Sequence, residues 1–499
     1  MERLPDELFQ SILLFIPLRR RLVLESVCRR WMLRMPYERL RHLDLVQILF
    51  PDRKNRMDTL PVTNALQQLL RRCGSHVERL SFGEMYLLIT PVTIQIAGEL
   101  CPRLRALDLS YSRVHFLPGN RLYCTVTDSL IPALFPLCAR LESLQLGNTS
   151  FTIRDSASHV ENMCQLFRQL SKLTRLDLTK TATQNFAAIP YLPASILSIN
   201  LNQCGPLRSS VLLDFLLNSG CNLEELHLSA YGSLDDTLLD VICHMRTLKC
   251  LELSHLTFIS HLSSQESYEG LNFAGLTMLT NLEELHLQYN HNVTDAVLRG
   301  ICTSSPRIRV LNLANNRCIT DFTPLTKLKH LTSLTVAATE RLCNGDLAKF
   351  ALSCSLKHFR ATNCPLLGAS GLRALMEGAT GPEILELSMT GQWDSDSVTD
   401  ELLISLLDTC KQLRILALHS CANLSDRALQ SAAHLVLPTK LTSLDLSFCS
   451  ELTDEGAGAI VAAAGGNKKM QQALTFYVHQ SKVTREMAEK SCENVKVIL

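Results

Sequence analysis

The 499-residue sequence lacks the short motifs that mark common catalytic centres. It contains no GxSxG nucleophile turn, no phosphate-binding P-loop, no HExxH helix and no GxGxxG loop. It also contains no CxxC pair, which is the spacing that zinc ribbons and thioredoxin-type redox sites use. We therefore expect a protein that is not an enzyme and that holds no metal and no cofactor.

Long apolar runs and a strong excess of one charge are also absent. No apolar run reaches the roughly 18 residues that a membrane-spanning helix needs. The apolar stretch 8–18 follows three acidic residues and is interrupted by two polar ones, which is not the composition of a secretory signal. The formal net charge of +1 argues against a generally basic nucleic-acid binder. Neither a membrane nor a nucleic acid is an expected partner.

Cysteine is abundant, with 19 residues, and many of them recur at equivalent places in a repeating pattern. A free cysteine behaves as a small buried apolar residue. With no secretory signal, we expect reduced structural thiols in a cytosolic or nuclear protein. The recurring cysteines are Cys101, Cys138, Cys221, Cys354 and Cys410 before a repeat, and Cys204, Cys364, Cys421 and Cys449 after one.

The pattern itself is LxxLxL, as in Leu223-Glu224-Glu225-Leu226-His227-Leu228, and copies begin mostly 23 to 37 residues apart. Self-similarity at this period is typical of stacked units that bury one another's apolar faces. It predicts an α/β solenoid with a curved parallel sheet inside and helices outside. The regular copies begin at Leu104, Leu141, Leu173, Ile196, Leu223, Leu248, Leu282, Ile308, Leu331, Leu356, Leu413 and Leu441.

Each unit reads as strand, turn, helix and return. Thr-Asp or Ser-Asp pairs such as Thr294-Asp295 and Thr320-Asp321 follow the strands, and such residues favour helix starts. Earlier strands are expected at Leu40-Leu43-Leu45 and Val77-Leu80-Phe82, with a helix over 60–70 between them. Two units depart from the pattern, because Pro382 stands in place of the first leucine before Leu385 and Leu387, and the unit near Leu474 is weak.

The central residue of each LxL points away from the buried leucines, because side chains alternate along a strand. Nearly all of these residues are polar, and acidic ones outnumber basic ones. We expect this concave face to bind a protein, and a basic segment would suit its charge. The alternative is ordinary solvation of an open sheet. The candidate substrate-binding residues are Asp177, Asn200, His227, Glu252, His286, Asn312, Arg360 and Glu386.

Three longer spacings mark insertions, at 111–130, 254–273 and 391–397. Insertions in a solenoid map to loops on one face, which is often the binding face. They are equally compatible with tolerated surface loops, because long loops cost little free energy to close.

The first forty residues carry apolar helical stripes with more apolar surface than so short a segment can bury. The segment contains, in order, Leu4-Pro5-x-Glu7-Leu8, Ile12, Ile16-Pro17, Leu22 and Val27-Cys28-Arg29-Arg30-Trp31. This order of residues resembles an F-box. An arginine run at 19–21 departs from the acidic residue that many F-boxes have there. The resemblance implies binding to the Skp-type adaptor of a cullin-RING ubiquitin ligase core. The residues implied to contact the adaptor are Leu4, Pro5, Leu8, Ile12, Ile16, Pro17, Leu22, Val27, Cys28 and Trp31.

The unit that begins at Leu441 resembles the cysteine-containing leucine-rich repeat that often accompanies an F-box. Together the two resemblances imply an F-box at 1–45, a linker helix with degenerate repeats at 46–103, and a leucine-rich-repeat solenoid at 104–499. They imply a substrate-recognition subunit of a Skp–cullin–F-box ubiquitin ligase with an unknown protein substrate. The alternative is a scaffold or inhibitor that binds the adaptor without directing ubiquitylation.

Overall fold

The structure is a computed structural model, and its contacts divide the chain into two compact units, Met1–Val241 and Ile242–Leu499. Each unit is taken by itself. The residues that the structure describes are 13, 16, 20, 21, 24, 37, 40–45, 62–83, 89–110, 125, 126, 130–147, 150, 151, 157–181, 187–204, 207–232, 234–256, 271–378, 383–390, 397–436, 440–465, 473–491 and 494–499.

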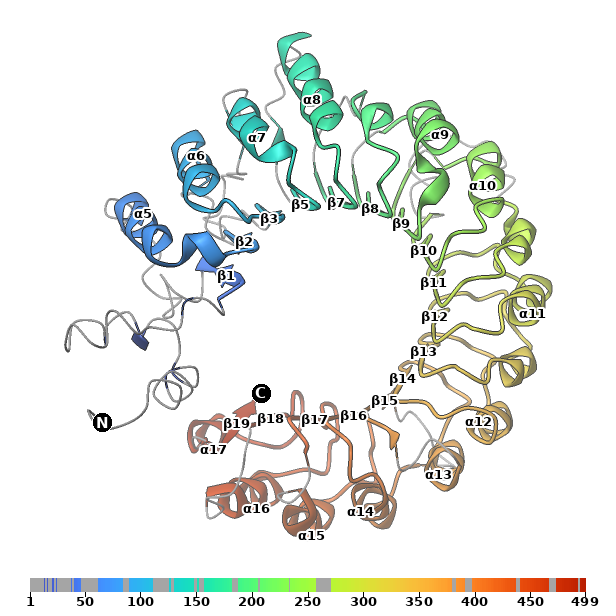
Figure 1. Cartoon of the computed structure of the whole chain (residues 1–499). Helices are drawn as coiled ribbons and strands as arrows, with labels where there is room; N and C mark the ends of the chain where they lie inside the picture. Colours follow the sequence, from blue (N-terminus) through green and yellow to red (C-terminus); the bar gives the residue numbers. More distant parts are fainter. Residues whose placement is uncertain are drawn as a thin grey trace. The chain divides into compact units, whose positions relative to one another are not determined.

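The first unit contains a parallel sheet whose strands follow one another in chain order (Figure 1). The strands pair in register, so that Leu43 lies beside Leu80, and Leu80 beside Leu107. A separate short pair joins β4 (Thr125–Val126) to β6 (Ser150–Phe151). The strands of the sheet are β1 (His42–Asp44), β2 (Arg79–Ser81), β3 (Ala106–Asp108), β5 (Ser143–Gln145), β7 (Arg175–Asp177), β8 (Ser198–Asn200) and β9 (Glu225–His227).

Helices cover one face of this sheet and leave the other face uncovered in the described part of the unit (Figure 1). Helix α6 shows how the sequence sets a helix start. Thr90 and Thr93 form a reciprocal capping box, and Pro91 occupies the first turn, where a proline costs no hydrogen bond. The helices are α5 (Val62–Cys73), η2 (Gly74–His76), α6 (Pro91–Leu100), α7 (Leu130–Cys138), α8 (Ala157–Gln169), η4 (Ile189–Tyr191), α9 (Ser209–Asn218), η5 (Gly220–Asn222) and α10 (Asp236–Cys243), which spans the boundary between the units.

The second unit repeats the same construction. Its strands also pair in parallel and in chain order. They are β10 (Cys250–Glu252), β11 (Glu284–His286), β12 (Val310–Asn312), β13 (Ser333–Thr335), β14 (His358–Ala361), β15 (Glu386–Thr390), β16 (Ile415–His419), β17 (Ser443–Asp445), β18 (Leu474–Tyr477) and β19 (Val495–Ile498). Its helices are η7 (Phe273–Met278), α11 (Asp295–Ser304), η8 (Thr323–Lys327), α12 (Asn344–Ala351), α13 (Ala369–Glu377), α14 (Asp400–Thr409), α15 (Asp426–Val436), α16 (Asp454–Gly465) and α17 (Arg485–Glu489).

The core of each unit is a stack of leucines from the LxxLxL pattern. Leu223, Leu226 and Leu228 are fully buried, and the equivalent leucines of the regular repeats from Leu104 onward are at most 3% exposed. Burying one such side chain contributes roughly 1.5–3 kcal/mol. The predicted solenoid of parallel strands and outer helices is therefore present in both units, and the early strands at 40–45 and 77–82 are confirmed.

A left-handed residue follows most of the sheet strands and turns the chain away from the sheet. Apart from Gly83 (φ 51°) after β2, these residues are neither glycine nor branched at Cβ, and each of them except Gln480 precedes a buried residue that ends the turn. The left-handed residues are Lys180, Gln203, Ala230, His255, Tyr289, Asn315, Ala338, Asn363, Ser420, Phe448 and Gln480, with φ between 51° and 65°.

The buried residue that comes next bonds the backbone of the preceding repeat. Nδ2 of Asn290 donates to the carbonyl of Leu253 (2.5 Å), and Nδ2 of Asn316 donates to the carbonyl of Leu287 (3.0 Å). Cysteine and threonine make the same bond elsewhere, which explains why cysteines recur after the strands. We name this set the turn ladder: Thr181, Cys204, Asn290, Asn316, Cys364 and Cys449.

The Thr-Asp pairs form a second ladder at the helix starts of the second unit. The predicted capping by the hydroxyl occurs at Thr399, which accepts from the amide of Leu402, but not at Thr294. The aspartates reach the next repeat instead: Asp295 accepts from the amide and hydroxyl of Thr320 (2.7 and 2.6 Å). We name Asp295, Asp400, Asp426 and Asp454 the helix-start ladder.

Three expectations need correction. Thr320-Asp321 begins no α-helix; the 3-10 helix η8 follows, because Pro324 and a repeat of only 23 residues, counted from Val310 to its partner Ser333, leave a single short turn. The first apolar residue of the unit before Leu387 is Ile384, not the position of Pro382, since Leu387 pairs with Phe359 and Ile384 is 2% exposed. Strand β19 was not predicted, and it extends the sheet beyond β18.

Candidate protein-binding face

The face of each sheet opposite its helices is named the sheet face, and the central residues of the LxL strands lie on it. The leucines on either side of them are buried, whereas the central residues are half-buried or exposed. Ala417 is an exception, at 9% exposure. The central residues of the strands therefore lie on the sheet face, and whether the candidate substrate-binding residues bind a substrate stays a prediction.

The structure brings these candidates together in two register-matched sets. Asp177, Asn200 and His227 lie side by side on β7, β8 and β9 of the first unit. In the second unit, Glu252 and His286 lie beside Asn312 on β10, β11 and β12. Each set is a row across three adjacent strands, about 4.8 Å apart per strand.

Several of the candidate residues have a structural role that sequence reasoning missed. Oδ1 of Asp177 accepts from the amide of Thr179 (2.8 Å), and Oδ1 of Asn312 accepts from the amide of Ala314 (3.1 Å). Asn200 makes the same bond to the amide of Asn202 (3.0 Å). These side chains hold the turn after the strand in the manner of an Asx-turn. The signal was present in the sequence as Asp or Asn two residues before the turn.

A groove of about 820 Å³ lies on the sheet face of the first unit. Side chains from β1 to β9 line it, and carboxylates outnumber arginines among them. The charged lining residues are Asp44, Glu78, Arg79, Arg105, Asp108, Glu142, Arg175, Asp177 and Glu225, with His42 and His227 beside them. A long charged groove of this kind can hold an extended chain and orient it by its charges.

Some of the charges in the groove are matched within the protein and some are not. Arg105 lies 3.3 Å from Glu142, and Arg41 lies 3.7 Å from Glu78, both at the start of the strands. Arg79 and Arg175 are exposed and form no ion pair with any residue that the structure describes. Free charges of this kind are available to a ligand, whereas the exposed pairs contribute little to stability.

In the second unit, Arg360 and Glu386 contact each other. Nε of Arg360 donates to Oε1 of Glu386 (2.6 Å), and Nδ1 of His358 lies 3.2 Å from Oε2 of the same carboxylate. Glu386 shares the sheet face but is not the central residue of its strand, because Ser388 pairs with Arg360. The expectation that Glu386 continues the central row is therefore wrong, since the register begins at Ile384.

An aromatic pair next to Glu252 adds a feature that sequence reasoning missed. The rings of His255 and Tyr289 stack with centroids 4.1 Å apart, and both residues hold the left-handed turn position. Burial lowers the pKa of His255, and the nearby Glu252 offsets part of this effect. The imidazole is therefore neutral at physiological pH.

Exposed apolar side chains occur among the last strands of the second unit, with Ile415 on β16 and Phe448 in the turn after β17. Phe448 is 49% exposed and Ile415 is 36% exposed, and Tyr477 packs near His479 with ring centroids 6.1 Å apart. Sequence reasoning did not single out these exposed apolar residues.

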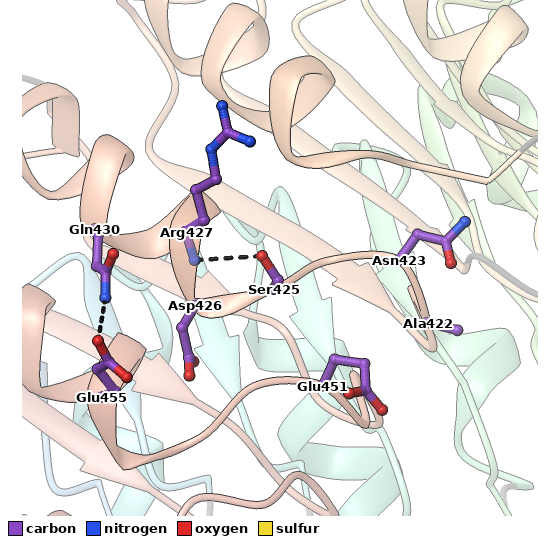
Figure 2. Close-up of a pocket in the computed structure, with 8 residues that line it drawn as sticks. All are labelled: Ala422, Asn423, Ser425, Asp426, Arg427, Gln430, Glu451 and Glu455. Carbon is purple, nitrogen blue, oxygen red and sulfur yellow. Dashed lines mark hydrogen bonds between the residues drawn. The ribbon is translucent and has the colours of Figure 1, made fainter.

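A shallow pocket of about 540 Å³ lies beside the helix-start ladder of the second unit (Figure 2). Gln430 donates to Glu455 (2.8 Å), and the carboxylate of Asp426 accepts from Thr453 (2.8 Å to the amide). In Figure 2 the Arg427 side chain extends away from the carboxylates of Asp426 and Glu451. Much of its polar lining is thus engaged in holding successive repeats together.

Nearly all of the implied adaptor-binding residues lie outside the described residues. Ile16 is described, as a half-buried residue, and Nε of Arg21 donates to its carbonyl (2.5 Å). The positions outside are Leu4, Pro5, Leu8, Ile12, Pro17, Leu22, Val27, Cys28 and Trp31. Most of the insertions at 111–130, 254–273 and 391–397 lie outside as well.

Within the described part of the chain, no group of His, Cys, Asp or Glu side chains has the arrangement of a metal site. No helix described there is long and apolar enough to cross a membrane. The 16 described cysteines are free thiols, and 13 of them are buried. Burial raises the pKa of Cys204 and of Cys302 to about 12, so these thiols are neutral and packed as core residues.

No protein-family model matches the chain. A Caenorhabditis elegans protein, EEED8.10, to which RNA binding is ascribed, is 23% identical over 399 residues. The match covers 78% of this chain and 49% of that protein, so the chain spans about half the length of this curated relative.

Three solved structures resemble the chain at low identity. A structure from the yeast Rad7–Elc1 complex is 17% identical, with a TM-score of 0.46, over 66% of this chain and 82% of that chain. An internalin of Listeria monocytogenes is 15% identical, with a TM-score of 0.36, over 88% and 94%. A leucine-rich-repeat protein of Leptospira interrogans is 17% identical, with a TM-score of 0.38, over 88% and 98%. The in-register LxxLxL strands in both units give the chain the fold of a leucine-rich-repeat solenoid.

Proposed function

We propose that the chain is a protein-binding leucine-rich-repeat subunit, and that it recognises the substrate of a Skp–cullin–F-box ubiquitin ligase. The observation that carries the binding role is the charged groove on the sheet face of the first unit. The F-box-like order of residues over 3–40 supports the attachment to the ligase. In this proposal the chain acts in the cytosol or nucleus and supplies no catalytic residue.

The mechanism is proximity. The F-box-like segment anchors the chain to the adaptor, and the sheet face holds a protein substrate. A lysine of that substrate then comes near a conjugating enzyme that carries ubiquitin. Holding two reactants together converts a bimolecular step into an effectively intramolecular one, which is the source of the rate gain.

RNA binding, which is ascribed to the Caenorhabditis elegans relative, is less favoured for this chain. The groove is lined by more carboxylates than arginines, and a phosphate backbone is repelled by such a surface. The ascribed function also belongs to a protein of which this chain covers only 49%.

Affinity purification of the wild type beside a Leu8→Ala/Trp31→Ala variant tests the proposal, because apolar and aromatic anchors dominate interfaces. We expect adaptor and cullin to co-purify with the wild type and not with the variant, while proteins bound by the sheet face remain with both. Absence of adaptor and cullin from the wild-type sample would refute the ligase role.

The scaffold alternative uses the same two segments and differs in outcome. If the chain directs ubiquitylation, depleting it lengthens the half-life of the proteins that co-purify with the double variant. If those half-lives stay the same while the adaptor binds, the chain is a scaffold or an inhibitor.

A further inference from the structure

Two lines of opposite charge run side by side through the groove of the first unit. In-register pairing aligns the central residues of five consecutive strands, which are Asp44, Ser81, Asp108, Gln145 and Asp177. Every second strand therefore carries an aspartate, and we name Asp44, Asp108 and Asp177 the aspartate row. Arg79 lies two residues before Ser81 on β2, and Arg175 lies two residues before Asp177 on β7. We name these two residues the arginine row.

The spacing of the aspartate row matches one conformation of an extended chain. Neighbouring strands lie about 4.8 Å apart, so that aspartates on alternate strands are about 9.6 Å apart. A polyproline II helix rises about 3.1 Å per residue with three residues per turn, so that every third side chain recurs on one side after about 9.3 Å. Basic residues at every third position would meet all three aspartates at once.

The arginine row restricts which basic segments fit. It lies about 6.6 Å from the aspartate row, two residues along the strands. A ligand with basic side chains on all of its sides would bring some of them against Arg79 and Arg175, which have no ion-pair partner among the described residues. Repulsion of this kind gives specificity beyond that of attraction alone.

We propose that this groove binds a polyproline II segment of a partner protein that carries an arginine or lysine at every third position. The inference rests on the protein-binding function proposed above and names the chemistry of the partner. The bound segment runs across the strands, with its basic side toward the aspartate row and its neutral or acidic side toward the arginine row.

The chain itself shows how to remove these charges without disturbing the fold. Oδ1 of Asp108 and of Asp177 accepts from a turn amide at 2.8 Å, and the amide oxygen of Asn200 accepts the equivalent bond. Asp108→Asn and Asp177→Asn therefore retain the turn bond and remove the charge, and Asp44→Asn removes the third charge of the row with little change in side-chain size. Asp445→Asn is the matched control, because Asp445 makes the same bond (3.0 Å) in the second unit, outside the groove.

The test uses the purified full-length chain and two labelled peptides of the same composition. One has three arginines, each separated by two prolines, and the other has the three arginines adjacent. We expect the spaced peptide to bind about tenfold more tightly, with an affinity that falls as salt is added. The variant Asp44→Asn/Asp108→Asn/Asp177→Asn should lose about tenfold in affinity and most of the salt dependence with its unfolding midpoint unchanged, and Asp445→Asn should bind as wild type does.

A second variant tests the selectivity. In Arg79→Gln/Arg175→Gln, the adjacent-arginine peptide should approach the affinity of the spaced one. Equal binding of both peptides by the wild type, or unchanged binding by the triple variant, would overturn the inference, as would displacement of the spaced peptide by a single-stranded RNA oligonucleotide. If neither peptide binds while partner proteins still co-purify with the chain, the inference fails and the proposed function stands.

Discussion

At the scale of single residues, a few buried polar side chains hold neighbouring repeats together. Asn290 is fully buried, and its amide group donates to the carbonyls of Leu253 (2.5 Å) and Leu287 (3.0 Å). Its oxygen accepts from the amide of Leu256 (3.2 Å). A buried donor or acceptor left without its partner costs about 1–3 kcal/mol.

We predict that Asn290→Ala lowers the free energy of unfolding by about 2–4 kcal/mol, because it leaves buried backbone groups of two repeats without a hydrogen-bond partner. Asn290→Thr should lose less, since Thr181 bonds a carbonyl from the equivalent position (3.2 Å). Urea unfolding followed by circular dichroism measures both. Asn218→Ala, at an exposed position on α9, serves as the control and should change stability by less than about 0.5 kcal/mol. A loss at Asn290 no larger than that of the control would refute the role of the turn ladder.

The helix-start ladder makes the stability of the second unit depend on pH. Partial burial raises the pKa of Asp295, but the hydrogen bonds from Thr320 and Asp321 outweigh burial, and the pKa lies below its ordinary value. The amide and hydroxyl of Thr484 likewise hold the pKa of Asp454 below its ordinary value. A carboxyl group with a lowered pKa stabilises the fold above the pKa of the unfolded chain, about 3.9, and this stabilisation is lost as pH falls through the folded pKa.

We therefore predict that Asp295→Asn/Asp454→Asn is less stable than the wild type at pH 7 and that the difference narrows as the pH falls below about 4. The natural asparagine Asn344 accepts two bonds of this kind, from the amides of Gly368 (2.8 Å) and Gly371 (3.1 Å). An asparagine can therefore replace the aspartate as an acceptor, and the variant should still fold. Urea midpoints at pH 7, 5 and 3.5 give the comparison. A difference that is the same at all three values would mean that the carboxylate charge is irrelevant to the ladder.

At the scale of the repeated element, a left-handed residue after most of the strands imposes the turn. A left-handed conformation costs a residue with a Cβ roughly 1–2 kcal/mol, and a branched Cβ makes it worse. The chain places no valine, isoleucine or threonine at any of the described positions of this kind. The requirement for a left-handed turn is thus visible in the sequence, because residues with a branched Cβ are absent from these described turn positions.

Ala338, with φ 53°, offers a direct test of the turn. Ala338→Val should lower the free energy of unfolding by about 1–2 kcal/mol, and Ala338→Gly should not lower it, because glycine adopts this conformation freely. Differential scanning calorimetry detects the effect. The control is Ala337→Val, because Ala337 is not among the left-handed residues. Equal losses at 337 and 338 would show that crowding, and not the backbone, limits the substitution.

How far the sequence predicts these elements depends on which contacts a single repeat contains. The strands, the buried leucines and the outward central residues follow from LxxLxL within one repeat. The predicted register of β15 was wrong, because the sequence allows either Leu385 and Leu387 or Leu387 and Met389 to be the LxL pair. Burial of Ile384 and Met389 shows that the second pairing is the one formed. The two ladders and the Arg360–Glu386 contact were not predictable in this way, because their partners lie in the next repeat.

At the scale of the whole molecule, the reactivity of the cysteine thiols shows whether each unit is folded. Burial raises the pKa of Cys101 and Cys138 in the first unit, and of Cys302 in the second, to about 12. Only the thiolate reacts with alkylating reagents, so buried thiols are protected twice, by access and by charge.

We predict that iodoacetamide at pH 8 labels the exposed Cys221 and Cys318 of the native protein and spares the 13 buried thiols. In urea all of these cysteines should react. Mass spectrometry of the digested protein gives the extent at each site. Rapid labelling of Cys204 or Cys302 in the native chain would mean that its unit opens readily or is packed differently.

The in-register pairing of each strand with the next also determines when the protein can fold. Partners within a unit are at most 37 residues apart in the chain, as for His42 with Arg79 and Ala106 with Ser143. Contacts between residues so close in sequence form quickly. Because synthesis adds only about 5–20 residues each second, the first repeats have time to stack before the last ones are translated. We therefore expect the groove of the first unit to be assembled on the ribosome while the second unit is still being made.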